Sequence, residues 1–141
     1  MSVESTVVEM AKAARQAAGE LARCSSVKKN EALEAIAQKL TRRAPEIKSE
    51  NAKDVEQARD NGLSEAMIDR LRLDDKGIQS MVDGLWDVAI FPDPVGEITR
   101  MWRRPNGLLV GRVRIPLGVI GFIYESRPNV TVDAAALCLK S

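Results

Sequence analysis

The chain has 141 residues, of which 45% are hydrophobic and 29% are charged, and its formal net charge at pH 7 is +1. This composition is typical of one soluble globular domain. It gives neither the basic field of a nucleic-acid binder nor an apolar run of the ~20 residues that span a bilayer. With two cysteines, no histidine and no secretory signal pattern, the sequence indicates no disulfide framework and no metal site, and it favours the cytoplasm.

The first predicted elements are helices. Residues 2–24 carry apolar side chains at the three- and four-residue spacing of one helix face: Val7, Met10, Ala14, Ala17 and Leu21. A second helix is expected to begin at Ser25 or Ser26, which are suitable N-caps, with Leu33, Ile36 and Leu40 as its apolar stripe. Pro45 is expected to begin a third helix, because the first turn tolerates a residue without an N–H.

Turn residues divide the chain that follows. Asn61-Gly62 predicts the end of the third helix. Ser64 is expected to cap a short helix that ends near Leu73, and a further helix is predicted from about Asp74 to Ala89. The sequence Phe-Pro-Asp-Pro at 91–94 breaks it. The chain therefore begins with a helical block.

A β-hairpin is predicted over residues 97–115, because Asn106-Gly107 separates two strand-like runs. Its charged residues are five arginines and the single acid Glu97, and Trp102 lies among them. Such a ribbon could bind nucleic acid, or it could be an arm that pairs with a neighbouring subunit. The near-neutral remainder of the chain favours the second interpretation, so we expect no nucleic-acid partner.

The last elements are a strand and a helix. The run "LGVIGFIY" at residues 117–124 is apolar throughout, which favours a strand buried on both faces in a parallel sheet. Val130 to Ser141 is predicted to be a helix, with Ala134, Leu137 and Cys138 on one side. The predicted fold class is therefore α/β: a helical block, a hairpin arm and a first strand-loop-helix unit.

The turn between this strand and helix is the candidate binding site, and its residues are Glu125, Ser126, Arg127, Pro128 and Asn129. Ligands of open α/β sheets bind beyond the carboxyl ends of the strands, and helix N-termini attract anions. Arg127 suits a phosphate or a carboxylate, and Asn129 could contact a developing oxyanion. In the simpler alternative, Asn129 only caps the helix and Arg127 only pairs with Glu125 or Asp133.

Neither cysteine is predicted to be reactive. Cys138 lies within an apolar helix, and Cys24 lies at a helix end, where the dipole disfavours a thiolate. The glycines of "GVIG", residues 118–121, lie inside the predicted strand and do not form a dinucleotide fingerprint. We therefore identify no catalytic residue in this chain beyond the possible oxyanion contact of Asn129.

Four stretches resemble gamma-glutamyl phosphate reductase, a family also called glutamate-5-semialdehyde dehydrogenase, of the aldehyde dehydrogenase superfamily. In order they are "SSVKKNEALEAIAQKL", "ENAKDVEQARDNGLSEAMIDRL", "DPVGEITRMWRRPNGLLVGRVRIPLGVIG" and "RVRIPLGVIGFIYESRPNVTVDAAALCLKS". The resemblance implies that residues 1–141 are the N-terminal part of a Rossmann-like dinucleotide-binding domain. It also implies that residues 97–115 form an oligomerisation arm and that the catalytic domain is absent from this chain.

The implied reaction is the NADPH-dependent reduction of gamma-glutamyl phosphate to glutamate 5-semialdehyde and phosphate in proline biosynthesis, by a homo-oligomeric enzyme. The family's nucleophilic cysteine lies beyond position 141, and neither Cys24 nor Cys138 matches its motif. The superfamily's Pro-Trp-Asn turn is replaced here by residues 125–129. The alternative function is a non-catalytic helical adaptor whose basic hairpin binds a partner or nucleic acid.

Overall fold

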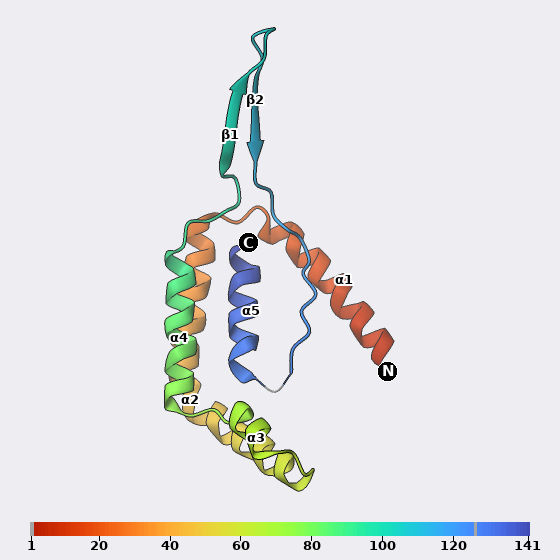
Figure 1. The fold of residues 1–141 in the computed structure, drawn as a ribbon, viewed down its shortest axis with the longest axis vertical. Helices are drawn as coiled ribbons and strands as arrows, with labels where there is room; N and C mark the ends of the chain where they lie inside the picture. Colours follow the sequence, from red (N-terminus) through yellow and green to blue (C-terminus); the bar gives the residue numbers. More distant parts are fainter. Residues whose placement is uncertain (1, 126) are drawn as a thin grey trace.

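The computed structural model describes residues 2–125 and 127–141 (Figure 1). In the described part, the elements are α1 (Val3–Leu21), α2 (Ser26–Asp60), α3 (Glu65–Leu71), α4 (Asp75–Ile90), β1 (Ile98–Arg103), β2 (Leu109–Val113) and α5 (Pro128–Lys140). None of the described helices combines the length and the apolar character needed to cross a membrane.

The main core lies where α2, α4 and α5 pack side by side (Figure 1). Its buried residues are Leu33, Ala37, Val82, Leu85, Val88, Ala89 and Ala136. Of the stripe predicted for the second helix, Leu33 is fully buried and Leu40 packs against the core, whereas Ile36 is 37% exposed. On α5, the buried side carries Ala136 and Lys140, while Leu137, predicted on the apolar side, is exposed.

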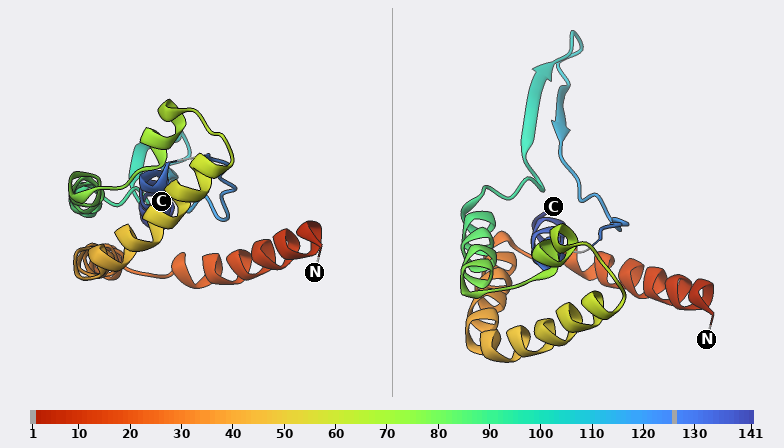
Figure 2. Two further views of the ribbon diagram at one scale, coloured as in Figure 1. Left: turned by 90° about the horizontal axis from the view of Figure 1, so that it is seen from below. Right: turned by 60° about the horizontal axis from the view of Figure 1, so that its bottom comes forward.

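Helix α2 runs without a break through Pro45, so the prediction that a third helix begins at Pro45 is wrong. The helix bends strongly between its orange and yellow parts, the region that contains Pro45 (Figure 2). A proline inside a helix removes one backbone hydrogen bond and bends the axis. The bend turns the second half of α2 toward α3, where Val55, Ala58 and Ile68 form a second core cluster.

Local capping chemistry explains the helix ends. The side-chain oxygen of Ser25 accepts a hydrogen bond from the Lys28 N–H at 3.3 Å, and Asp74 Oδ1 accepts one from the Gly77 N–H at 2.7 Å. Gly62 follows α2 with a φ of 73°, in the left-handed region that favours glycine. Ser64 lies at the predicted N-cap of α3, but its side chain makes no capping hydrogen bond.

Helix α1 confirms the first helix prediction but lies apart from the main core (Figure 2). None of its residues is buried, and Val7 and Met10 of its apolar stripe are 57% and 66% exposed. The N-terminal part of its apolar face is therefore uncovered, whereas Leu21 at the other end is half-buried.

The predicted hairpin is confirmed and projects away from the helices (Figure 1). Strands β1 and β2 are antiparallel, and their pairing runs from Ile98 opposite Val113 to Arg103 opposite Leu109. At the turn, the Gly107 N–H donates to the Arg104 carbonyl at 2.9 Å, and Gly107 has a φ of 87°.

The strand predicted at residues 117–124 is wrong for this chain. The described residues 114–125 form no strand, and Leu117 and Ile123 are 73% and 101% exposed. A strand needs a neighbour to pair its N–H and C=O groups, and the described chain supplies none beside this segment. The segment therefore lies as an extended connection beside α5 (Figure 1).

Candidate functional site

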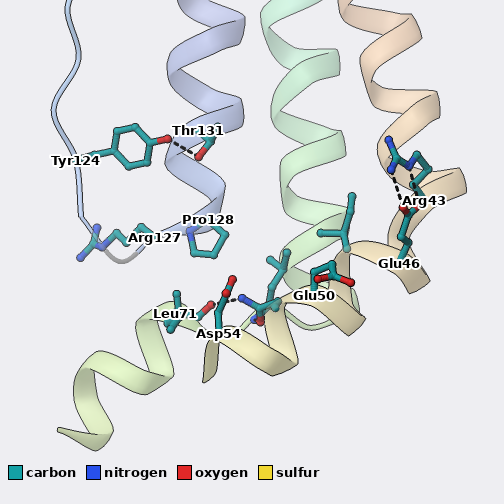
Figure 3. Close-up of a pocket in the computed structure, with 12 residues that line it drawn as sticks. Arg43, Glu46, Glu50, Asp54, Leu71, Tyr124, Arg127, Pro128 and Thr131 are labelled. Atoms are coloured by element: carbon teal, nitrogen blue, oxygen red, sulfur yellow. Dashed lines mark hydrogen bonds and ion pairs between the residues drawn. The ribbon is translucent and has the colours of Figure 1, made fainter. Parts of the chain in front are cut away.

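The turn that precedes α5 opens onto a cleft of about 450 Å³ between the start of α5 and the second half of α2, with Leu71 at the end of α3 also lining it (Figure 3). Of the predicted site residues, Arg127 and Pro128 line this cleft, whereas Glu125 is exposed and does not line it. Ser126 lies outside the described residues. The structure therefore brings two of the five predicted residues to one cavity.

Arg127 occupies the N-cap position of α5, and Pro128 begins the helix. Pro128 suits this position, because it keeps Arg127 in the extended region, with a φ of −135° and a ψ of 98°. Arg127 is exposed, and no ion pair within the described residues joins it to Glu125 or Asp133. Its side chain is thus exposed next to the positive end of α5, and in Figure 3 its guanidinium points away from Glu50 and Asp54 of the opposite wall.

Asn129 is a helical residue of α5 and not its cap, so the capping alternative is wrong. Its side-chain amide Nδ2 donates to Asp133 Oδ2 one turn further along the helix, at 3.4 Å. This long hydrogen bond lies on the exposed side of the first turn of α5.

Tyr124 lines the cleft, although the sequence indicates only that it ends the apolar run at residues 117–124. Its hydroxyl lies 2.7 Å from the Thr131 hydroxyl, and both side chains line the cleft (Figure 3). This hydrogen bond ties the extended segment to the second turn of α5. It therefore helps to fix the position of the turn that carries Arg127.

The opposite wall of the cleft is acidic. Glu46, Glu50 and Asp54 recur every four residues along α2, so their carboxylates share one helix face. Arg43 donates two hydrogen bonds to Glu46, at 2.7 and 2.8 Å, which lower the pKa of Glu46 and raise that of Arg43. Glu50 pairs with Lys53 at 2.7 Å.

Asn51, the one buried polar residue of this wall, holds the floor of the cleft together. Its Nδ2 donates to the Leu71 carbonyl at 2.8 Å, and its Oδ1 accepts from the Leu73 N–H at 2.7 Å. The arrangement can bind a ligand that carries both negative and positive groups. It offers no cysteine, and the described part of the chain holds no group of residues suited to a metal ion.

Both cysteines lie elsewhere, as free, half-buried thiols. Cys24 and Cys138 line a separate cavity of about 520 Å³ that is also lined by residues of α1, α5 and the extended segment. Neither cysteine lines the cleft beside Arg127 and Pro128.

Comparison with known proteins gives consistent matches over the whole chain. It is 57% identical over 141 residues to gamma-glutamyl phosphate reductase of Geotalea daltonii and 54% identical over the same length to that of Clostridium novyi. In each case it spans 34% of the relative's length, so it corresponds to about a third of these proteins. No family model matches the chain.

Solved structures of gamma-glutamyl phosphate reductases match in fold. The gamma-glutamyl phosphate reductase of Thermotoga maritima has a TM-score of 0.91 and 47% identity, with 94% of this chain and 32% of that chain covered. The Saccharomyces cerevisiae enzyme has a TM-score of 0.89 and 34% identity, with 94% and 34% covered. The resemblance predicted from the sequence is therefore confirmed, as is the α/β class of the chain.

Proposed function

We propose that residues 1–141 are the N-terminal third of an enzyme that reduces gamma-glutamyl phosphate to glutamate 5-semialdehyde and phosphate, with NADPH, in proline biosynthesis. The observation that carries this proposal is the 57% identity to gamma-glutamyl phosphate reductase over the full 141 residues. A cytoplasmic location fits the free state of both cysteines in the structure.

In this proposal the chain supplies binding surface and not the nucleophile. The reaction needs a thiolate to attack the acyl phosphate, and the remaining two thirds of the enzyme would provide that cysteine. NADPH, when bound, supplies the hydride for the reduction. The residues of this chain that suit its phosphates, or the acyl phosphate, are Arg127 and the positive end of α5.

The roles proposed at the turn follow from chemistry. The Arg127 guanidinium binds an anionic group of substrate or cofactor through paired N–H donors. Asn129 is the proposed oxyanion contact, and its amide would exchange the 3.4 Å hydrogen bond to Asp133 for one to the substrate. Glu125, Ser126 and Pro128 belong to the same proposed binding turn, with Pro128 holding its backbone at the start of the helix.

The hairpin is proposed as the arm through which identical subunits assemble. The strand register places Ile98, Met101 and Val113 on one face together with Leu109, and all four are at least half exposed. An isolated two-stranded hairpin is marginally stable in water, so these side chains favour packing against protein. The opposite face carries Arg100, whose guanidinium lies 5.4 Å from the centre of the Trp102 ring.

A hybrid enzyme tests the reductase proposal. Residues 1–141 replace the matching third of the Geotalea daltonii gamma-glutamyl phosphate reductase, and NADPH oxidation is measured with and without gamma-glutamyl phosphate. We expect substrate-dependent oxidation by the hybrid and none by residues 1–141 alone. A folded hybrid without activity would count against the proposal. Strong, salt-dependent binding of DNA or RNA by the segment would favour the adaptor alternative.

A further inference from the structure

Two lysines are buried at the end of the helical block from which the arm projects. Lys29 and Lys140 are each 4% exposed, although lysine is rarely buried unless its ammonium is paired. Lys29 Nζ donates to Asp93 Oδ1 at 3.2 Å and to the Lys140 carbonyl at 3.1 Å. Lys140 Nζ donates to Asn30 Oδ1 and, at 2.9 Å, to the Ala89 carbonyl.

These contacts join four parts of the chain. Lys29 and Asn30 lie in the first turns of α2, Ala89 lies in the last turn of α4, and Lys140 ends α5. Asp93 lies on the connection from α4 to the arm, and its side chain is 8% exposed. The cluster thus connects the base of the arm to the helices that form the core.

The cluster lies very close to the first pairing of the arm. Asp93 Oδ1 accepts a hydrogen bond from the Val95 N–H at 2.9 Å. The next residue, Gly96, donates its N–H to the Arg114 carbonyl at 2.9 Å, which continues the hairpin pairing below β1 and β2. Asp93 is therefore hydrogen-bonded next to the point where the two strands of the arm leave the helical block (Figure 1).

A buried ion pair is weak evidence for stability, and in some proteins its role is to specify geometry. Replacing such a pair with apolar residues is often neutral or stabilising, whereas removing one partner leaves an uncompensated charge. Each N–H···O contact needs a distance near 2.9 Å and a direct approach, and apolar packing has no such requirement. If the base of the arm moved by a few ångströms, Lys29 would lose its ion pair with the Asp93 carboxylate.

We propose that Lys29 is a positioning residue for subunit assembly: by binding Asp93 and the end of α5 together, it fixes the angle of the arm to the core. This inference rests on the proposed role of the arm. It does not depend on the reductase activity, because the predicted effect is on assembly.

The test uses the hybrid enzyme and three variants. Lys29→Met removes one charge of the pair, and Lys29→Met with Asp93→Asn removes both while keeping an acceptor for the Val95 N–H. Ile68→Ala is the matched control, because Ile68 is 1% exposed but belongs to the α2–α3 cluster and not to the cluster at the arm. The melting temperature and the subunit dissociation constant, by analytical ultracentrifugation over a dilution series, are measured for each.

We expect both Lys29 variants to raise the dissociation constant at least tenfold. The double variant should melt closer to the wild type than Lys29→Met does, and Ile68→Ala should lower the melting temperature without weakening assembly. If Lys29→Met does not fold, the double variant carries the test.

The proposal is overturned if the double variant assembles like the wild type. It is also overturned if Ile68→Ala weakens assembly as much, or if neither Lys29 variant folds, because lost stability would then explain the effect. A wild-type hybrid that stays monomeric would overturn the role of the arm and this inference with it. An assembled but inactive hybrid would overturn only the proposed activity.

Discussion

Arg127 shows how far a single residue can be interpreted from its place in the chain. Its position before Pro128 and after an apolar run indicated the end of an extended segment and the start of a helix. The structure places it at the N-cap of α5 on the wall of a cleft. Within the described residues it has no ion pair to Glu125 or Asp133, so the guanidinium keeps its capacity to bind an anion.

Substitution of Arg127 in the hybrid enzyme tests this role. Arg127→Ala should lower kcat/KM, and the loss should correspond to about 1.5–3 kcal/mol of transition-state stabilisation, the usual range for a charged hydrogen bond. Arg127→Lys should recover part of this loss. Arg42→Ala, an exposed arginine of α2 that does not line the cleft, is the control. Wild-type kinetics in both Arg127 variants would contradict the assignment, and loss of folding would make the residue structural.

Asp93 gives a pH-dependent prediction at the same scale. Burial alone would raise its pKa, but hydrogen bonds from the Val95 N–H and from Lys29 outweigh burial and lower it. A lowered folded-state pKa means that ionised Asp93 stabilises the fold above the unfolded value of about 4. That contribution is lost as the pH falls through the folded-state value.

The measurement is the melting temperature of the hybrid enzyme and its Asp93→Asn variant between pH 7 and pH 3. The variant should be less stable at pH 7, by up to about 3–5 kcal/mol for a broken buried pair, and the difference should shrink below pH 4. A difference that stays constant over this range would show that the charge of Asp93 is unimportant.

At the scale of elements, local signals were reliable where the cause is local. Asn61-Gly62 ended a helix and Asn106-Gly107 turned the hairpin as predicted, because each acts on backbone groups within a few residues. The helix predicted from about Asp74 does begin there, with Asp74 as its N-cap. Pro45 misled because a proline inside a helix can bend the axis without ending the helix, and α2 continues through it. The strand at 117–124 misled because pairing requires a neighbour that no local pattern supplies.

The arm gives the prediction that belongs to this scale. Shortening the hairpin in the hybrid enzyme, by joining residue 96 to residue 114 through two glycines, removes the apolar face formed by Ile98, Met101, Leu109 and Val113. The native mass should shift toward the monomer, because this face would lose its partner. Deletion of residues 2–10 from α1, which has no buried residue, serves as a comparison. An unchanged oligomer after the arm is shortened would contradict the role.

At the scale of the whole molecule, the sequence predicted the helical block, the hairpin and the last helix, but it divided α2 at Pro45 and indicated only part of the site. Arg127 and Pro128 could be chosen because turn chemistry marked them. The acidic residues of α2 that line the cleft could not be predicted from the sequence, because their distance from the turn depends on the bend in the region of Pro45. The burial of Lys29 and Lys140 could not be predicted either, because their contacts join residues 64 and 111 positions apart in the sequence.

The last prediction concerns residues 1–141 without the rest of the enzyme. Large apolar side chains stay exposed on the extended segment, where Ile115, Leu117 and Ile123 are 78%, 73% and 101% exposed. Such a surface, with unpaired backbone groups beside it, favours association between chains. The isolated chain should therefore associate at micromolar concentration and melt without a single cooperative transition.

Sedimentation and thermal unfolding of the isolated chain check this expectation. Leu117→Lys with Ile123→Lys should reduce association, because charges on the exposed segment oppose contact between chains. Val113→Lys places a lysine on an exposed residue of β2 instead. Comparing the two variants shows whether association occurs through the extended segment or through the arm. A monomeric chain with one cooperative unfolding transition would mean that the α2–α4–α5 core suffices for stability, since the 115–124 segment would then need no covering strand.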